Sequence, residues 1–223
     1  MLSIIEFFTT FVKRPDKVIM EFINQYGYWI YAALFLIIFA ETGLIIMSFI
    51  MPFLPGDALI FAIGMIAASD DQNHLHIEYI IPLLMLAAIL GDNLNYYIGH
   101  RFGEWLMTNP NKFFIKPRHL EKATVFFNEN GKKAIIIARF MPVVRTIIPF
   151  ICGTTRLPYK TFITYSFLGA ILWVGVISML GYFLGQFTLV KEHLELFIFG
   201  IIIAANTPML IRIIKAKLQK NKP

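Results

Sequence analysis

Four ionisable residues lie inside strongly apolar segments of the chain. Glu41 and Asp57 belong to the first such segment, and Arg139 and Arg145 belong to a later one. A charge at the centre of a bilayer costs about 3 kcal/mol on insertion scales, so these side chains should pair with one another or face a polar cavity. Two interpretations stay open. Either the charges form ion pairs that only hold the apolar segments together, or they line a membrane-embedded polar site.

The chemistry of these side chains favours a phosphate site linked to protons. Arg139 and Arg145 suit a phosphate because a guanidinium group stays ionised and donates two parallel hydrogen bonds. Glu41 and Asp57 can carry protons because burial in an apolar medium favours the neutral form of a carboxyl group. We therefore predict that the two arginines bind the phosphate, and that the two acids exchange protons and compete for the same arginines.

Three other polar residues are candidates for a supporting role. Asp92 lies in the next apolar segment, where it should be functional or paired and not exposed to lipid. Its neighbour Asn93 either belongs to the site or hydrogen-bonds between helices. Arg156 lies near the end of the later apolar segment, which contains Arg139 and Arg145. It either extends its charged end to the membrane surface or draws in an anionic head group.

The acidic pair and the arginine pair each lie in an apolar segment that contains helix-breaking residues. These segments are residues 29–68 and 134–157. We predict hairpin tips at Pro52, Pro55 and Gly56 in the first segment, and at Pro142, Pro149 and Gly153 in the second. The first segment is either two membrane-spanning helices or a re-entrant hairpin. Its short second arm, residues 58–68, favours the re-entrant hairpin.

The elements that carry these residues are those of an integral membrane protein. Of the 223 residues 57% are hydrophobic, above the roughly 45–50% of soluble domains. We predict full spans near residues 79–100, with an interruption at 91–93, and near 161–187 and 196–214. Amphipathic helices should lie at the membrane surface near residues 1–27 and 117–130. The expected fold class is all-α, with two opposed re-entrant hairpins, about three full spans and interfacial helices.

The basic residues indicate how the chain is oriented. The net charge is +6, and the basic segments 101–133 and 212–223 should face the cytoplasm, which places the C-terminus there. No basic run is interleaved with aromatic residues, so the charge indicates anionic lipid and not nucleic acid. Self-association into a homo-oligomer stays open.

Each broken segment begins a similar unit. Both contain Pro-Phe-x-x-Gly, at residues 52–56 and 149–153, and both are followed by a span that ends in Gly-x-x-x-Gly, at 99–103 and 181–185. With the predicted orientation the two hairpins enter from opposite sides. The units then form an inverted repeat, as in many secondary transporters. Chance similarity is the alternative, because Gly and Pro are common in membrane helices.

Other kinds of site find little support. A single cysteine, Cys152, excludes an internal disulfide and a multi-cysteine metal site, and we expect it to be a small packing residue. The histidine spacing does not resemble a metal site, and nucleophile, nucleotide and zinc-protease motifs are lacking. We therefore expect no metal, no cofactor and no enzymatic activity. A lipid phosphatase would need a nucleophile or a metal.

Several of these motifs resemble a known family. Glu41 with Phe-Leu-Pro-Gly-Asp at 53–57, the run 91–103 and the run 138–153 are similar to the bacterial DedA family, part of the wider VTT (SNARE-associated Golgi protein) group. Ser166, Gly169 and Trp173 add to this similarity. It covers about residues 28–190, between an N-terminal helix (1–27) and a C-terminal helix with a basic tail (191–223).

The resemblance implies two opposed re-entrant hairpins, with the family's acidic pair at Glu41 and Asp57 and its arginine pair at Arg139 and Arg145. It also implies a bacterial cytoplasmic membrane protein that moves phospholipid or undecaprenyl phosphate, with a link to proton motive force. We predict a multi-pass, proton-linked transporter of a lipid phosphate, whose partners are membrane lipids and protons. The alternatives are a proton-coupled small-solute or drug antiporter, and a non-transporting membrane assembly protein.

Overall fold

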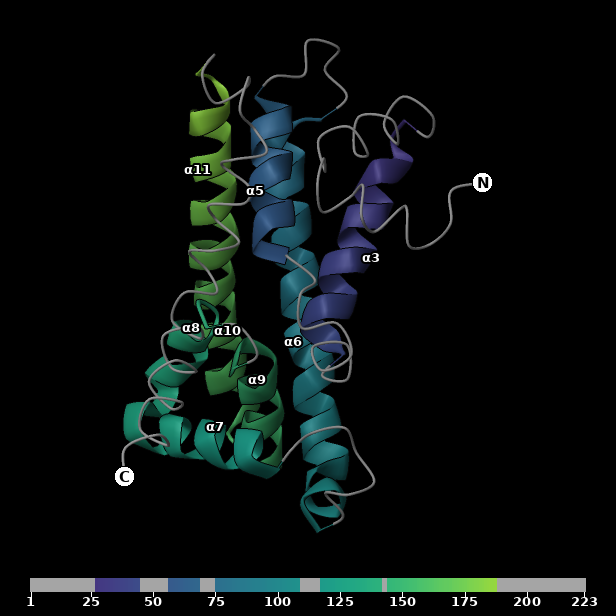
Figure 1. Cartoon of the computed structure of the whole chain (residues 1–223). Coiled ribbons are helices and arrows are strands. Elements are labelled where there is room, and N and C mark those ends of the chain that lie inside the picture. Colours follow the sequence, from purple (N-terminus) through teal and green to yellow (C-terminus); the bar gives the residue numbers. More distant parts are fainter. Residues whose placement is uncertain (1–26, 45–55, 69–74, 109–116, 142–143, 188–223) are drawn as a thin grey trace, which may run out of the picture.

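The computed structural model describes residues 27–44, 56–68, 75–108, 117–141 and 144–187, and every regular element within these ranges is a helix. In chain order they are α3 (Trp29–Gly43), α5 (Gly56–Ala67), α6 (Ile77–Thr108), α7 (Pro117–Asn130), η2 (Gly131–Lys133), α8 (Ala134–Ala138), α9 (Val144–Thr154), α10 (Tyr159–Ala170), η3 (Ile171–Gly175) and α11 (Val176–Gly185) (Figure 1). The prediction of an all-helical chain is confirmed for these residues.

Two segments are long and apolar enough to cross a membrane. They are Ile77–Gly103 within α6 and Tyr159–Gly185, which joins α10, η3 and α11. Both agree with predicted spans. The third predicted span, residues 196–214, lies outside the described residues, as do residues 1–26 of the predicted N-terminal helix.

Helix α6 runs through residues 91–93 without a break, so the predicted interruption there is wrong. Gly91 serves a close contact instead. A Cβ atom at this position would lie 2.0 Å from the Thr42 hydroxyl oxygen and 2.8 Å from the backbone nitrogen of Gly43. Small residues at such crossings let helix backbones approach closely in a membrane. Gly91 therefore brings α3 against α6.

The segment α10–α11 crosses α6 in the opposite direction. Near one end, the Tyr159 hydroxyl donates a 2.8 Å hydrogen bond to Asn93. Farther along, a Cβ atom at Gly175 would lie 3.4 Å from the terminal methyl of Met85. Residue numbers thus fall along α6 as they rise along α10–α11, so the two long helical segments are antiparallel.

Two short helices each pack against the long segment in the other half of the sequence: α9 packs against α6, and α5 packs against α11. In the α6–α9 contact, a Cβ atom at Gly99 would lie 2.1 Å from the carbonyl oxygen of Phe150, and one at Gly153 would lie 2.0 Å from that of Tyr96. Both glycines are therefore required by backbone contact between the helices. The first Gly-x-x-x-Gly motif forms part of this contact.

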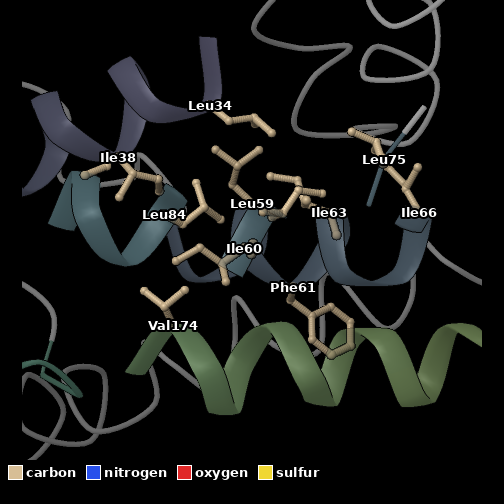
Figure 2. Close-up of a cluster of buried hydrophobic side chains, with 14 of the residues drawn as sticks. Leu34, Ile38, Leu59, Ile60, Phe61, Ile63, Ile66, Leu75, Leu84 and Val174 are labelled. Atoms are coloured by element: carbon tan, nitrogen blue, oxygen red, sulfur yellow. The ribbon is translucent and has the colours of Figure 1, made fainter. Parts of the chain in front are cut away.

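The α5–α11 contact is built in the same way. A Cβ atom at Gly181 would lie 2.3 Å from the carbonyl oxygen of Phe61, and one at Gly64 would lie 2.3 Å from that of Ser178. Around it a buried apolar cluster joins α3, α5, α6 and η3 (Figure 2). Phe61 and Gly64 take the places that Phe150 and Gly153 occupy in the other contact.

The comparison of the two contacts corrects the register of the sequence repeat. The Pro-Phe-x-x-Gly motifs pair Gly153 with Gly56, whereas the packing pairs Gly153 with Gly64. The two pairings differ by about two turns of helix. The repeated feature is therefore the glycine contact between a short and a long helix, and the proline motif is not in the matching position.

The predicted hairpin tips are only partly described. Pro52, Pro55 and Pro142 lie outside the described residues, and Gly56 is the first residue of α5. Pro149 and Gly153 lie within α9, so the prediction that they form the second tip is wrong. A proline removes one helical hydrogen bond, which does not end this helix.

The predicted helix 117–130 is confirmed as α7, which lies across the direction of α6 (Figure 1). Helix α7 contacts α8 and α9.

Candidate functional site

Arg145 joins the two predicted acids. It lies in the first turn of α9, and its guanidinium group forms ion pairs with Glu41 from the end of α3 and with Asp57 from the start of α5. The Arg145 Nη1–Asp57 Oδ1 distance is 2.8 Å. The side chain of Glu41 is 6% exposed, that of Arg145 12% and that of Asp57 24%. Three helices thus bring three of the four predicted charges together, and Asp57 is the most accessible of them.

Gly56 makes room for the Glu41 carboxylate. A Cβ atom at this position would lie 1.9 Å from Glu41 Oε2. The carboxylate therefore lies against the first residue of α5, where the positive end of the helix dipole stabilises a negative charge. Among the described residues Oε2 has no hydrogen-bond partner, while Oε1 pairs with Arg145.

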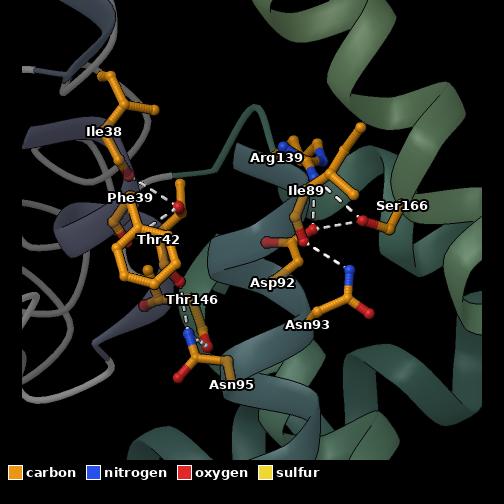
Figure 3. A network of polar contacts seen from close by, with 10 residues as sticks. All are labelled: Ile38, Phe39, Thr42, Ile89, Asp92, Asn93, Asn95, Arg139, Thr146 and Ser166. Atoms are coloured by element: carbon orange, nitrogen blue, oxygen red, sulfur yellow. Dashed lines mark hydrogen bonds and ion pairs between the residues drawn. The ribbon is translucent and has the colours of Figure 1, made fainter. Parts of the chain in front are cut away.

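Arg139 does not pair with the predicted acids. Its Nη2 pairs with Asp92 of α6 and donates a 3.2 Å hydrogen bond to Ser166 of α10. Ser166 in turn donates a 2.7 Å hydrogen bond to the same Asp92 oxygen (Figure 3). The side chains of Arg139 and Asp92 are only 4% and 5% exposed. Asp92 is thus the direct partner of an arginine, a larger role than the supporting one predicted for it.

Trp173 contacts both groups of charges. Its indole N–H donates a 2.8 Å hydrogen bond to Asp57 Oδ1. The central guanidinium carbon lies 4.8 Å from the ring centroid for Arg145 and 5.9 Å for Arg139. Both distances are within the range of cation–π attraction. Asp57, Arg139 and Arg145 therefore contact one buried indole ring, and Glu41 joins them through its ion pair with Arg145.

Comparison with known proteins now shows the family. The VTT domain family matches residues 54–183. Protein DedA of Escherichia coli strain K12 is 42% identical over 216 residues, which cover 97% of this chain and 96% of DedA. The chain belongs to the DedA family.

Two further relatives are named as membrane proteins. An uncharacterized membrane protein of Mycobacterium leprae is 36% identical over 179 residues, covering 80% of this chain and 77% of the relative. The inner membrane protein YghB of Escherichia coli K12 is 33% identical over 170 residues, covering 74% of this chain and 72% of YghB. No solved structure matches this chain.

Asn95 ties together the backbone on either side of the Glu41–Arg145 pair. Its amide nitrogen donates to the carbonyl oxygens of Thr42, at 2.5 Å, and Thr146, at 3.4 Å (Figure 3). These threonines directly follow Glu41 and Arg145 in the chain. One buried amide on α6 thus fixes the end of α3 and the beginning of α9 in this DedA-family protein.

The two remaining predicted polar residues lie farther from the arginines' ion pairs. Asn93 donates to Ile89 O of its own helix at 2.7 Å and accepts from Tyr159, so it hydrogen-bonds between helices. Arg156 is exposed in the turn after α9. About 14 Å of helix separates Arg145 from the end of α9 at Thr154, and Arg156 lies beyond that end. The structure does not bring Arg156 into the charged site.

Sequence reasoning missed Ser166 and Trp173 as partners of the charges. A tryptophan in an apolar span was the available signal, because a buried indole N–H usually has a hydrogen-bond partner. Within the described residues, His, Cys, Asp and Glu form no group of three or more that could hold a metal ion.

Proposed function

We propose that this DedA-family protein moves a lipid phosphate, such as undecaprenyl phosphate or a phospholipid, across the bacterial cytoplasmic membrane in a process linked to protons. The observation that carries the proposal is Arg145, which two carboxylates from separate helices hold and which lies near the same indole ring as Arg139. Phosphate and carboxylate accept the same forked pair of hydrogen bonds from a guanidinium group. A phosphate can therefore replace the carboxylates on Arg145.

The proposed path follows from the arrangement of the helices. We place α3–α5 and α8–α9 as two opposed re-entrant hairpins of a multi-pass protein with a cytoplasmic C-terminus. The antiparallel course of α6 and α10–α11, and the matching glycine contacts, support this inverted arrangement. The phosphate would pass between the hairpins while the lipid tail stays in the bilayer.

The charge count supports coupling to protons. Glu41, Asp57 and Asp92 supply three carboxylates, and Arg139 and Arg145 supply two guanidinium groups, which gives a formal charge of −1. An uncompensated buried charge is costly, so uptake of one proton by Glu41 or Asp57 stabilises the closed site. A second proton leaves both acids neutral. Arg145 is then held only by weaker neutral hydrogen bonds and can accept a phosphate.

The proposal is tested with purified protein in liposomes. Movement of a labelled lipid phosphate between leaflets is measured with and without a proton gradient. Loss of a hydrogen bond to a charged group costs about 1.5–3 kcal/mol, so Arg145→Gln and Arg139→Gln should each slow movement by about tenfold or more. Arg156→Gln is the matched control, and it should move lipid at the native rate. If lipid moves at the native rate in both Arg145→Gln and Arg139→Gln, the two arginines do not bind the phosphate.

A second candidate function rests on the burial of the Arg139–Asp92 pair. A closed, fully buried pair also suits a membrane assembly protein in which the charges only hold helices together. That function predicts that Asp92→Arg with Arg139→Asp restores activity by re-forming the pair with reversed charges. Transport predicts that this double variant stays inactive, because the arginine is displaced from its position beside Trp173. Flux of a small solute through liposomes without lipid phosphate would instead favour an antiporter.

A further inference from the structure

One face of the segment Tyr159–Gly185 receives both arginines. Ser166, Gly169 and Trp173 follow one another at spacings of three and four residues, which places them on a single helix face. Ser166 hydrogen-bonds to Arg139. At Gly169 a Cβ atom would lie 2.8 Å from the Arg139 side-chain carbon Cδ, so this glycine leaves room for the arginine. Trp173 is the next residue on this face, and it reaches Arg145 as well.

A π-helical turn sets the direction of Trp173. Residues Ile171–Gly175 form the π-helix η3, with α-helix on both sides. The extra residue of a π-turn rotates the following helix by about 100° relative to a continuous α-helix. Trp173 and Gly181 both contact α5, through Asp57 and Phe61, so they lie on the same side of the segment. The turn thus lets one helix hold α5 and point an indole ring at the arginines. Such turns are frequent at functional sites.

The contacts of Trp173 link both arginines to one acid. Asp57 Oδ1 accepts hydrogen bonds from the indole N–H and from Arg145 Nη1, both at 2.8 Å. The same indole ring lies near the guanidinium carbons of Arg145 and Arg139. Two guanidinium groups repel each other, and the electron-rich ring offsets this repulsion by attracting both. Trp173 is only 1% exposed, so water does not weaken these attractions.

We propose that Trp173 is a positioning residue that makes Arg139 and Arg145 a single site for one phosphate group. Its ring keeps the two guanidinium groups together when the carboxylates leave them. Its N–H keeps Asp57 next to Arg145 when no phosphate is bound. This inference rests on the proposed function. It adds that the affinity of the two arginines for phosphate falls when the indole ring is removed.

Two variants separate the ring from the N–H group. Trp173→Phe keeps an aromatic face and removes only the donor to Asp57, whereas Trp173→Leu removes both. Binding of short-chain phosphatidic acid to the detergent-solubilised full chain is measured by calorimetry. Trp173→Phe should bind within about threefold of the native affinity, and Trp173→Leu about tenfold more weakly. Trp29→Leu replaces a 72% exposed tryptophan and is the matched control, which should bind as the native protein does.

The action of Trp173 through the arginines is tested by combining variants. In Arg145→Gln the ring has lost one of its two cations, so adding Trp173→Leu should weaken binding by much less than the tenfold seen in the native background. A loss of the same size in both backgrounds would show that Trp173 does not act through Arg145, and would overturn the inference. Native affinity in Trp173→Leu would overturn it as well.

A lipid-independent measurement keeps the inference testable if the native protein binds neither phosphatidic acid nor undecaprenyl phosphate, the result that would refute the proposed function. Trp29→Phe with Trp105→Phe leaves Trp173 as the single tryptophan. In this protein Arg139→Met and Arg145→Met should each shift the tryptophan emission, because a cation beside the ring is removed. Arg156→Gln should leave the emission unchanged. Emission that responds to neither arginine would overturn the positioning role. The same measurement applies if Trp173→Leu does not fold.

Discussion

Substitution of a single glycine in α11 should displace an acid from the charged site. A Cβ atom at Gly181 would lie 2.3 Å from the carbonyl oxygen of Phe61 in α5. Carbon–oxygen contacts between helices are ordinarily about 3.3–3.6 Å, so Gly181→Ala requires α5 to move away by roughly 1 Å. Asp57 is one turn before Phe61 in the same helix. Its hydrogen bond to Arg145, now 2.8 Å, would then exceed the hydrogen-bond range.

The expected energy follows from two opposing terms. Overpacking of a well-packed contact costs about 1–3 kcal/mol, whereas alanine in place of glycine favours a helix by about 1 kcal/mol. Gly181→Ala should therefore lower the free energy of unfolding by up to about 2 kcal/mol. It should also slow lipid movement more than this loss of stability explains, because Asp57 no longer reaches Arg145.

The matched control is in the same segment. A Cβ atom at Gly175 would meet only the flexible terminal methyl of Met85, at 3.4 Å. Gly175→Ala should therefore unfold no more easily than the native protein and should transport normally. Unfolding is measured in detergent micelles, and lipid movement in liposomes. If Gly181→Ala is as stable and as active as Gly175→Ala, the contact between α5 and α11 does not position Asp57, and the reasoning fails.

The remaining predictions concern the polar contacts. Asp92→Asn should lower the free energy of unfolding in detergent by about 3–5 kcal/mol, because it leaves the Arg139 charge buried without its partner. Native stability of Asp92→Asn would contradict the Arg139–Asp92 pairing. The double variant Asp92→Asn with Arg139→Met should recover stability but not transport. Asn95→Ala removes the donor to two carbonyl groups and should cost about 1–3 kcal/mol by the same measurement; a change near zero would show that α3 and α9 do not depend on it. Gly56→Ala places a Cβ atom 1.9 Å from the Glu41 carboxylate and should slow transport in liposomes, whereas native transport would show that the position of Glu41 is not critical.

Much of the charged site could be predicted because charges in apolar sequence are rare and costly. Glu41, Asp57 and Arg145 stand out for this reason alone, and the structure brings them into contact. The partner of Arg139 could not be predicted in the same way. Three carboxylates and two arginines allow several pairings, and only the packing of α10 against α6 and of α8 against α10 selects Asp92.

The helices followed the apolar periodicity and length of the segments, but glycine and proline were harder to interpret. Gly91 was expected to interrupt a span, and Pro149 and Gly153 to form a hairpin tip, whereas all three lie within helices. A glycine at a helix crossing and a glycine at a turn look alike in sequence. What distinguishes them is the neighbouring backbone, which sequence does not show.

The π-turn at Ile171–Gly175 also had no signal in the sequence. Its apolar residues suit a regular α-helix, whereas the π-turn carries a tryptophan that contacts both α5 and the arginines. Tertiary contacts therefore decide the direction of Trp173. This explains why the residue that connects the two groups of charges was not among the predicted site residues.

The central claim is that a lipid phosphate replaces the carboxylates on Arg145, beside Arg139. A structure of the protein determined with bound phosphatidic acid, at a pH where the acids are protonated, tests it most directly. The account predicts a phosphate within hydrogen-bond distance of both guanidinium groups, with Glu41 and Asp57 withdrawn from Arg145. A head group bound elsewhere, with Arg145 still held by both carboxylates, would contradict it.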